Sequence, residues 1–269
     1  IAEIGILISM KEFANHQPNS RPANLSYRAA AVGVSALLFG PTRLSISGQE
    51  NLPERGPILL AYTHHNSWDV PATAIAVWRT IKQPVEFVGK EEFFDHPRLG
   101  PLFKSLGALA INRDRTDFSQ IKSAAQVLRD GGILGVAPEA GRVNGRDVTN
   151  IRPTVGLVAV FGGAEITPVG VAGRQDIHKL RPRAMQLHFE PPIKPLYRLP
   201  AENDLERYDR MAALPAEAIG AAQEIKVRLK TAMQSALDEA MERYSASYGH
   251  YPQLLPEETL AQNDHESRY

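Results

Sequence analysis

The sequence predicts an α/β fold in which helices cover a mixed, mainly parallel β-sheet. Short runs rich in β-branched residues alternate with helix-like segments, which is the pattern of such folds. The composition is that of an ordinary globular protein, with 43% hydrophobic and 22% charged residues among 269. The formal net charge is zero, so nucleic acid is not expected as a partner.

Seven apolar runs predict the strands of the sheet, and three longer segments between them predict helices. The expected strands are residues 43–47, 57–62, 85–89, 108–112, 133–137, 166–171 and 185–189, and the expected helices are residues 70–81, 118–130 and 152–162.

The two ends of the sequence differ from this alternating region. The apolar run 29–40 is shorter than the ~20 residues that span a bilayer. It predicts an N-terminal apolar helix that packs on the core or lies on a membrane surface. We expect a single domain over residues 26–245, with an N-terminal tail (1–25) and a polar C-terminal tail (246–269). A long C-terminal amphipathic helix is predicted by apolar residues spaced four apart, namely Ile225, Leu229, Met233, Leu237 and Met241.

Side chains that can take part in catalysis or metal binding cluster in the stretch "AYTHHNSWDVPA", residues 61–72, which overlaps the end of a predicted strand. On a continuous helix His64 and Asp69 would lie about 140° apart, so they meet only if the chain turns first. Pro71 favours a helix that starts near Asp69, since proline is tolerated in the first turn. In that geometry the carboxylate could orient the imidazole, and His64 could take a proton from a hydroxyl.

Two other interpretations of this cluster remain open from the stretch alone. Asp69 or Ser67 could simply cap the helix. Alternatively, the cluster could bind a metal ion, but neighbouring residues of an extended chain point to opposite faces, which weakens a site shared by two adjacent histidines. The residues of that metal site would be His64, His65 and Asp69, with His96 or Glu139.

Arginine and glutamate residues follow two further predicted strands. Arg113 and Arg115 come after one, and "PEAGRVNGR", with Glu139, Arg142 and Arg146, comes after another. Loops at the carboxyl ends of strands commonly line the ligand crevice of an α/β sheet. Guanidinium groups there would suit a phosphate. Glu139 could bind an acceptor hydroxyl or form a structural pair with Arg142.

Several enzyme classes lose support from what the sequence lacks. It has no cysteine, which excludes a cysteine acyl intermediate made by this chain. It also has no G-x-S-x-G elbow, no G-x-x-x-x-G-K-[ST] loop and no G-x-G-x-x-G turn. Serine hydrolases, P-loop nucleotidases and dinucleotide enzymes therefore become less favoured.

Taken in order, these blocks resemble the glycerolipid and lysophospholipid acyltransferase family. The H-x-x-x-x-D block of the family matches His64 to Asp69, and its second block matches "GALAINR", which ends at Arg113. Its P-E-G-T-R block matches "PEAGR", and its late T-P-V strand matches "ITPVGV" with Pro168. The chain departs from the family pattern at Asn66, where a serine is usual, and in reading E-A-G-R for E-G-T-R.

The resemblance implies transfer of a fatty acyl group from acyl-CoA or acyl carrier protein to a hydroxyl of lysophosphatidic acid, a related lysophospholipid or glycerol phosphate. Alternatives are a glycolipid acceptor and a non-catalytic lipid-binding module of the same fold. His64 and Asp69 would be catalytic, and backbone amides near Asn66 are candidate donors to the oxyanion. No metal and no cofactor beyond the thioester co-substrate is implied. The implied substrate-binding residues are Asn66, Arg113, Glu139, Gly141 and Arg142.

Because its substrates reside in bilayers, the resemblance also implies a peripheral or monotopic protein on the cytoplasmic face of a membrane. The N-terminal apolar segment is the expected contact surface. A basic run could assist it, although a merely solvated surface would look the same. This run consists of Arg174, Lys179, Arg181, Arg183, Lys194 and Arg198.

Overall fold

The structure, a computed structural model, describes most of the chain between residues 27 and 248. In this part of the chain the strands form one sheet in the order β1-β7-β6-β2-β5-β3-β4. The described residues are 27–29, 32–33, 36, 43–66, 68–97, 99–111, 118–143, 146–173, 184–199 and 214–248.

The sheet is mixed and mainly parallel, which confirms the predicted fold class. Strands β6, β2, β5, β3 and β4 run parallel to one another. Strand β7 is antiparallel to β6, and β1 pairs in parallel with β7 at the sheet edge. The strands are β1 (Arg43–Ser47), β2 (Ile58–Tyr62), β3 (Glu86–Lys90), β4 (Leu109–Ile111), β5 (Ile133–Val136), β6 (Glu165–Gly173) and β7 (Ala184–Phe189).

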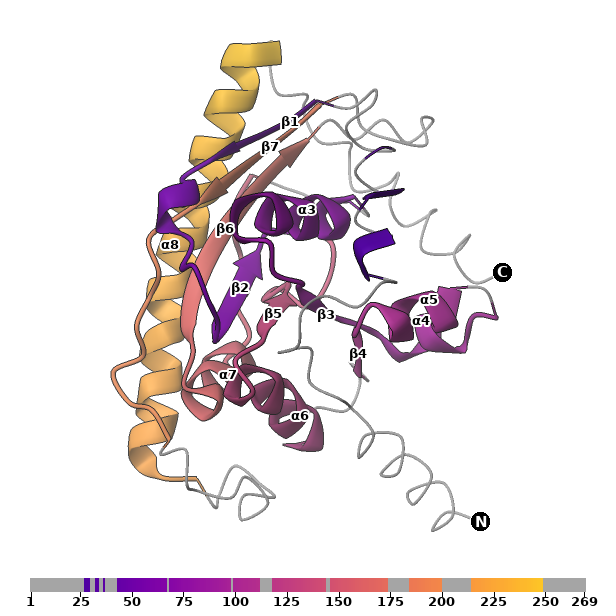
Figure 1. Ribbon diagram of the computed structural model, residues 1–269. Helices are drawn as coiled ribbons and strands as arrows, with labels where there is room; N and C mark the ends of the chain where they lie inside the picture. Colours follow the sequence, from indigo (N-terminus) through magenta and orange to yellow (C-terminus); the bar gives the residue numbers. More distant parts are fainter. Residues whose placement is uncertain are drawn as a thin grey trace.

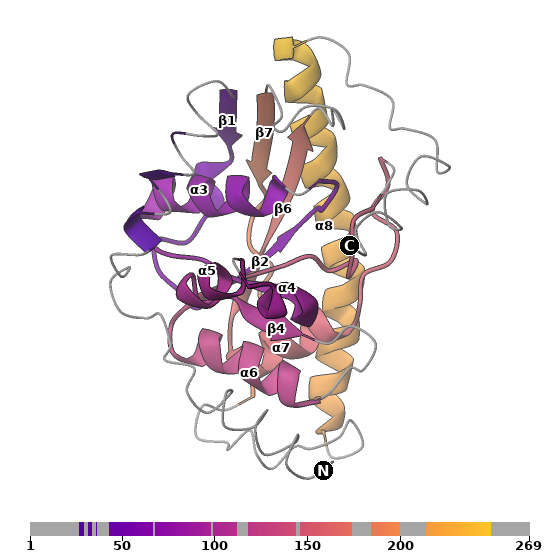
Figure 2. The same cartoon turned by 90° about the vertical axis from the view of Figure 1, so that its right-hand side faces the viewer.

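Helices cover both faces of the sheet. One core cluster joins α3 to one face, and another joins α6, α7 and α8 to the opposite face. Figures 1 and 2 show α8 running along the sheet on the side away from α3. The helices are α3 (Asp69–Ile81), α4 (Glu91–Asp95), α5 (Leu99–Ser105), α6 (Phe118–Arg129), α7 (Thr154–Gly162) and α8 (Ala216–Tyr248), with a short 3₁₀ turn, η1 (Gln49–Asn51).

Strand β2 shows why the sequence reads as a continuous apolar run. All five of its residues are buried. Leu59 and Ala61 belong to the cluster under α6, α7 and α8, whereas Leu60 and Tyr62 belong to the cluster under α3. A parallel strand covered by helices on both faces needs apolar side chains at every position.

Helix α8 is the predicted C-terminal amphipathic helix, and it lies very close to the sheet. Its buried residues include Ile225, Leu229 and Met233, three of the residues that predicted it. A Cβ atom added to Gly170 of β6 would overlap the backbone carbonyl of Ala236 on α8. Glycine therefore permits this close approach of helix and strand, and 33 residues of helix can lie along the sheet over about 50 Å.

The structure differs from the sequence prediction between β3 and β4. Two short helices, α4 and α5, pack together there, with the rings of Phe94 and Phe103 5.9 Å apart. Their short length and two prolines, Pro97 and Pro101, hid them, because proline breaks the periodic pattern of a helix.

Parts of the terminal predictions lie outside the described residues. The chain is helical at residues 27–29, 32–33 and 36, but the rest of the expected N-terminal helix and residues 1–25 are not described. At the other end α8 continues to Tyr248, and residues 249–269 are not described. Within the described residues, no helix combines the length and the apolar character needed to cross a membrane.

Candidate active site

His64 and Asp69 meet where β2 gives way to α3. Strand β2 ends at Tyr62 and α3 begins at Asp69, so the chain turns between them as predicted. Nδ1 of His64 lies 3.5 Å from Oδ2 of Asp69, with the side chain of His64 14% exposed and that of Asp69 1% exposed. This distance is too long for a hydrogen bond, but such contacts often tighten when a substrate binds. His64 also lines a cleft beside this pair.

The carboxylate of Asp69 also organises the turn that carries His64. Its Oδ2 accepts hydrogen bonds from the backbone amides of His65 (2.6 Å) and Asn66 (2.7 Å). These charge-assisted bonds offset the cost of burying the carboxylate. They also engage the amides of His65 and Asn66, so these two amides are not free to stabilise an oxyanion. Ser67 lies outside the described residues, so for its amide the expectation stays a prediction.

The side chain of Asn66 has a structural role at the start of α3. Its Oδ1 accepts the amide hydrogen of Trp68 at 2.8 Å, which is a local turn that asparagine commonly forms. The helix itself has no side-chain cap at Trp68, so Asp69 does not cap it as the alternative interpretation proposed. Asn66 is not among the described residues that line the adjacent cleft, and its role in substrate binding stays a prediction.

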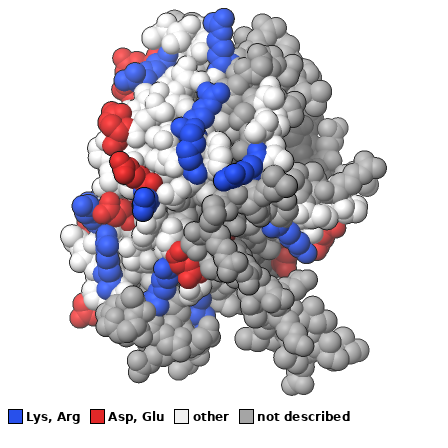
Figure 3. Space-filling model, in the orientation of Figure 1, with Lys and Arg blue, Asp and Glu red and all other residues white. Residues whose placement is uncertain are grey.

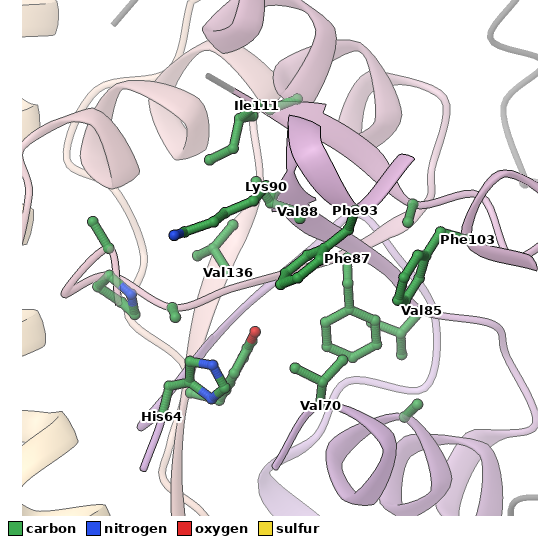
Figure 4. A pocket seen from close by; sticks show the side chains of 18 of the residues that line it. His64, Val70, Val85, Phe87, Val88, Lys90, Phe93, Phe103, Ile111 and Val136 are labelled. Carbon is green, nitrogen blue, oxygen red and sulfur yellow. The ribbon is translucent and has the colours of Figure 1, made fainter. Parts of the chain in front are cut away.

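His64 lies at one side of a large apolar cleft with a volume of about 670 Å³. Figure 4 shows His64 facing the same space as Val70, Val85, Phe87 and Val136. Most of the residues that line the cleft are aliphatic or aromatic. The volume is in the upper half of the roughly 300–1,000 Å³ that is typical of ligand pockets. A long apolar ligand group can therefore lie next to the His64 imidazole.

Basic side chains line the same cleft. Arg142 does so, as the sequence predicted, whereas Arg113 lies outside the described residues. The sequence prediction missed two more cations, Lys90 and Arg152, which also line the cleft. Lys90 could have been found by the rule that selected Arg142, because it is the last residue of a parallel strand. Arg152 carries no such signal, since it precedes α7 rather than following a strand.

The loop between β5 and α7 is fixed to the turn that holds His64. The amide of Val143 donates to the carbonyl oxygen of His64 at 2.9 Å, and the amide of Arg152 donates to that of Pro138 at 3.0 Å. Farther along, Gln234 of α8 accepts the amide of Val148 (2.8 Å) and donates to the carbonyl of Arg146 (2.9 Å). These bonds position the loop that carries Arg142.

Glu139 helps to hold this loop rather than facing the cleft. Its Oε1 accepts hydrogen bonds from the amide (2.8 Å) and the hydroxyl (3.2 Å) of Thr149. Glu139 pairs with Thr149 and not with Arg142, which was the structural pair considered from the sequence. Glu139 and Gly141 are not among the described residues that line the cleft, so their contacts with substrate stay predictions.

The described residues do not assemble the alternative metal site. No group of three or more His, Asp or Glu side chains in this part of the chain is placed to hold a metal ion. His65 is buried, and His96 is exposed beyond α4. His64 and Asp69 are therefore paired with each other, without a third ligand from His65, His96 or Glu139.

Tyr27 closes the cleft at the side of α3. Its ring lies 5.8 Å from that of Trp78, and its hydroxyl oxygen accepts the amide hydrogen of Val85 at 2.9 Å. Burial raises the pKa of the Tyr27 hydroxyl; the bond from Val85 opposes this shift and the charge of Glu86 adds to it. Tyr27 therefore stays neutral at ordinary pH and attaches the N-terminal segment to the domain.

Comparisons with known proteins agree with this geometry. The model of the Acyltransferase family matches residues 43–172, which include His64, Asp69 and Arg142. The 1-acyl-sn-glycerol-3-phosphate acyltransferase of Bacillus subtilis (strain 168) is 25% identical over 147 residues, which cover 55% of this chain and 71% of that protein. The crystal structure of the 1-acyl-sn-glycerophosphate acyltransferase PlsC from Thermotoga maritima has a similar fold, with a TM-score of 0.55 and 16% identity over 79% of this chain and 78% of that one. These comparisons support the glycerolipid acyltransferase family that the sequence resembles, a family of O-acyltransferases, with the family model matching just under half of the chain.

Proposed function

We propose that the protein transfers a fatty acyl group from a thioester, acyl-CoA or acyl carrier protein, to a hydroxyl of lysophosphatidic acid or a related lysophospholipid or glycerol phosphate. One observation carries the proposal: the His64–Asp69 pair borders an apolar cleft that Arg142 also lines. The cleft suits an acyl chain, the pair suits a hydroxyl, and the guanidinium suits a phosphate. The names of the two related enzymes support this acceptor.

In the proposed mechanism His64 is the general base. Asp69 faces Nδ1 and fixes the tautomer in which Nε2 is free to take the proton of the acceptor hydroxyl. The hydroxyl oxygen attacks the thioester carbon and forms a tetrahedral intermediate. When the carbon–sulfur bond breaks, the thiolate takes the proton back from His64. The acyl group passes directly to the acceptor, which agrees with a chain that has no cysteine.

Three cations are placed to bind the acceptor phosphate in this proposal. Arg142, Lys90 and Arg152 line the cleft that His64 borders. None of the described acidic residues forms an ion pair with Arg142 or Arg152, so both guanidinium groups are available to an anion. Arg113 would join them if its loop follows the family pattern.

We also propose a peripheral association with the cytoplasmic face of a membrane. Val32 is 69% exposed beside the Tyr27 anchor, and Phe93, which lines the cleft, is 46% exposed. Apolar side chains near the cleft could enter a bilayer and bring its mouth to the lipid. Of the basic run, Lys194 and Arg198 both pair with Glu165, and the other four residues lie outside the described residues. Figure 3 shows acidic and basic side chains on the same face, so charge gives weaker support than the apolar residues.

The experiment measures release of free thiol from palmitoyl-CoA, with and without lysophosphatidic acid, and identifies the lipid product by mass spectrometry. The parent protein is expected to release thiol only when acceptor is present and to form phosphatidic acid. His64→Ala should lower kcat by about 10²- to 10⁴-fold, because it removes the general base.

His96→Gln is the matched control, because His96 is exposed and is not among the described residues that line the cleft. This variant should keep the parent rate. If His64→Ala is folded and turns over at the parent rate, the assignment of the base is wrong. If the parent binds lysophosphatidic acid but transfers no acyl group to it, the protein is a lipid-binding module and the proposed function fails.

A further inference from the structure

The cleft is lined by side chains from both faces of the sheet. Successive residues of a strand point to opposite faces. Phe87 of β3 packs with the core cluster under α3, and Val88 packs with the cluster under α6 and α7, yet both residues line the cleft. In Figure 4, Phe87 lies toward Val70 and Val85, whereas Val88 lies toward Val136 and Ile111.

An opening in the sheet explains how one cleft reaches both faces. Strand β3 pairs with β5 only at Glu86 and Phe87. From Val88 to Lys90 it pairs with β4 instead, while β5 continues beside β2 as far as Val136. The pairing of β3 with β5 therefore stops at Phe87, and residues from the carboxyl ends of both strands, Lys90 and Val136, line the cleft together with His64.

The apolar residues that line the cleft consequently fall into two groups, one on each face of the sheet, which we call the two arms of the cleft. The α3 arm lies between α3 and the sheet, and the α6–α7 arm lies between those helices and the opposite face. Tyr62, Val70, Val85 and Phe87 line the α3 arm, together with Ala74 of α3 itself. Val88, Ile121, Ala124, Val136, Val155 and Val158 line the α6–α7 arm.

Two of the three cations of the cleft, Lys90 and Arg152, belong to the side of the α6–α7 arm. Lys90 is two residues after Val88 on β3 and so points to the same face. Arg152 is two residues before the start of α7, whose first turns line this arm. In lysophosphatidic acid the phosphate is attached to a carbon next to the one that carries the reacting hydroxyl. In a thioester donor, by contrast, the pantetheine chain separates the phosphates from the reacting carbonyl.

From this arrangement we infer that the α6–α7 arm binds the acyl chain that the acceptor already carries, while the α3 arm binds the chain of the donor. The inference rests on the proposed function and assigns a separate site to each of the two chains. His64 lies where the acceptor hydroxyl and the donor carbonyl have to meet. The enzyme would then measure the length of each chain independently.

Substitutions that narrow one arm at a time test this assignment. Ala124→Leu fills the α6–α7 arm, and Ala74→Leu fills the α3 arm. With a fixed donor, Ala124→Leu should lower kcat/KM for long-chain lysophosphatidic acids by about tenfold or more, because a well-packed pocket rejects extra methylene groups. The dependence of kcat/KM on the chain length of the acyl-CoA donor should stay unchanged. Ala74→Leu should lower kcat/KM for long-chain acyl-CoA donors and leave the dependence on acceptor chain length unchanged.

A pair of enlarging variants keeps the test valid if a narrowed protein fails to fold. Val158→Ala should extend the preferred acceptor chain and Val70→Ala the preferred donor chain. The inference is wrong if variants of both arms change the chain-length preference for the same substrate, whether donor or acceptor. That outcome would leave the proposed function intact, because the parent would still transfer the acyl group.

A binding measurement separates the inference from turnover. Fluorescent lysophosphatidic acid is titrated into the parent in the presence of a saturating, non-hydrolysable thioether analogue of palmitoyl-CoA. Simultaneous binding of both ligands, with only the lysolipid weakened by Ala124→Leu, would support two arms even if no transfer occurred. Competition between the two ligands for one apolar site would overturn the inference.

Discussion

Asp69 and Asn66 are joined by two reciprocal hydrogen bonds. Oδ2 of Asp69 accepts the amide of Asn66 at 2.7 Å, and the amide of Asp69 donates to the carbonyl oxygen of Asn66 at 3.3 Å. The turn that presents His64 is therefore closed on the carboxylate that faces its imidazole. The side chain of Asp69 therefore contacts both the backbone of the loop and the imidazole of His64.

This double role predicts two separable effects of Asp69→Asn. The amide oxygen can still accept the amides of His65 and Asn66, but it carries no charge and cannot stabilise an imidazolium. We expect kcat to fall by about 10²- to 10⁴-fold and the free energy of unfolding to fall by about 1–3 kcal/mol. Thiol release and urea unfolding measure these changes. A folded variant with parental kcat would show that Asp69 only shapes the turn.

Arg142→Ala should weaken binding of the phosphate-bearing acceptor. Loss of a charged hydrogen bond costs about 1.5–3 kcal/mol, so KM for lysophosphatidic acid should rise by roughly 10- to 100-fold. The KM for acyl-CoA should change less. Arg146→Ala is the control on the same loop, because Arg146 is exposed and is not among the residues that line the cleft. Equal effects of the two substitutions would point to general electrostatic attraction instead of a defined contact.

Ala140 has a left-handed backbone, with φ 60°, a conformation that alanine adopts at a cost. The glycine of the family pattern E-G-T-R falls at this position, and glycine has no such cost. We expect Ala140→Gly to raise the free energy of unfolding by about 0.5–1 kcal/mol. Lys82 has φ 58° and is not among the described residues that line the cleft, and Lys82→Gly should raise the free energy of unfolding by a similar amount. Thermal unfolding of both variants tests this; a lower Tm for Ala140→Gly would mean that its methyl group contributes more than the strain costs.

Two glycines of the α8 region should respond in opposite ways to the same substitution. Gly170→Ala would push a methyl group into the backbone of α8, with an expected loss of about 3 kcal/mol or more. Gly220 is an exposed residue of α8 with open space around it, so Gly220→Ala should stabilise the helix by about 0.5–1 kcal/mol. Urea unfolding at neutral pH compares the pair. Equal effects would contradict the close packing of helix and strand.

Tyr27→Phe removes the acceptor of the buried Val85 amide and should cost about 1–3 kcal/mol at neutral pH. Because the pKa of Tyr27 is raised by folding, its neutral form stabilises the protein fully below the pKa of an unfolded tyrosine, near 10. That part of the stability is lost as the pH rises toward the folded pKa. The parent should therefore lose more stability than Tyr27→Phe in alkaline solution. If the free energy of unfolding falls equally in both proteins as the pH rises, the pKa of Tyr27 does not change on unfolding.

The sequence was sufficient to predict the fold class and the central pair of residues, for identifiable reasons. The strands are continuous apolar runs because both faces of the sheet are covered, as in β2, and Pro71 marks the start of α3. Lys90 and Arg152 were missed because their position depends on how β3 leaves β5 and on how the loop before α7 folds back onto Pro138. Such long-range placements leave no periodic signal in the chain. The hydrogen bond between Glu139 and Thr149 also leaves no such signal, and it stands where the sequence suggested a pair between Glu139 and Arg142.

The contact of Gln234 with the loop that carries Arg142 has a consequence for biosynthesis. On the ribosome, the sheet as far as β7 and this entire loop are made before Gln234 exists, because α8 follows them in the chain. A nascent chain that ends before α8 would hold His64 and Asp69 but would leave the Val148 amide and the Arg146 carbonyl without the glutamine that fixes them. The loop that carries Arg142 would therefore reach its final form only after α8 has emerged, so the complete cleft lining would form late in synthesis.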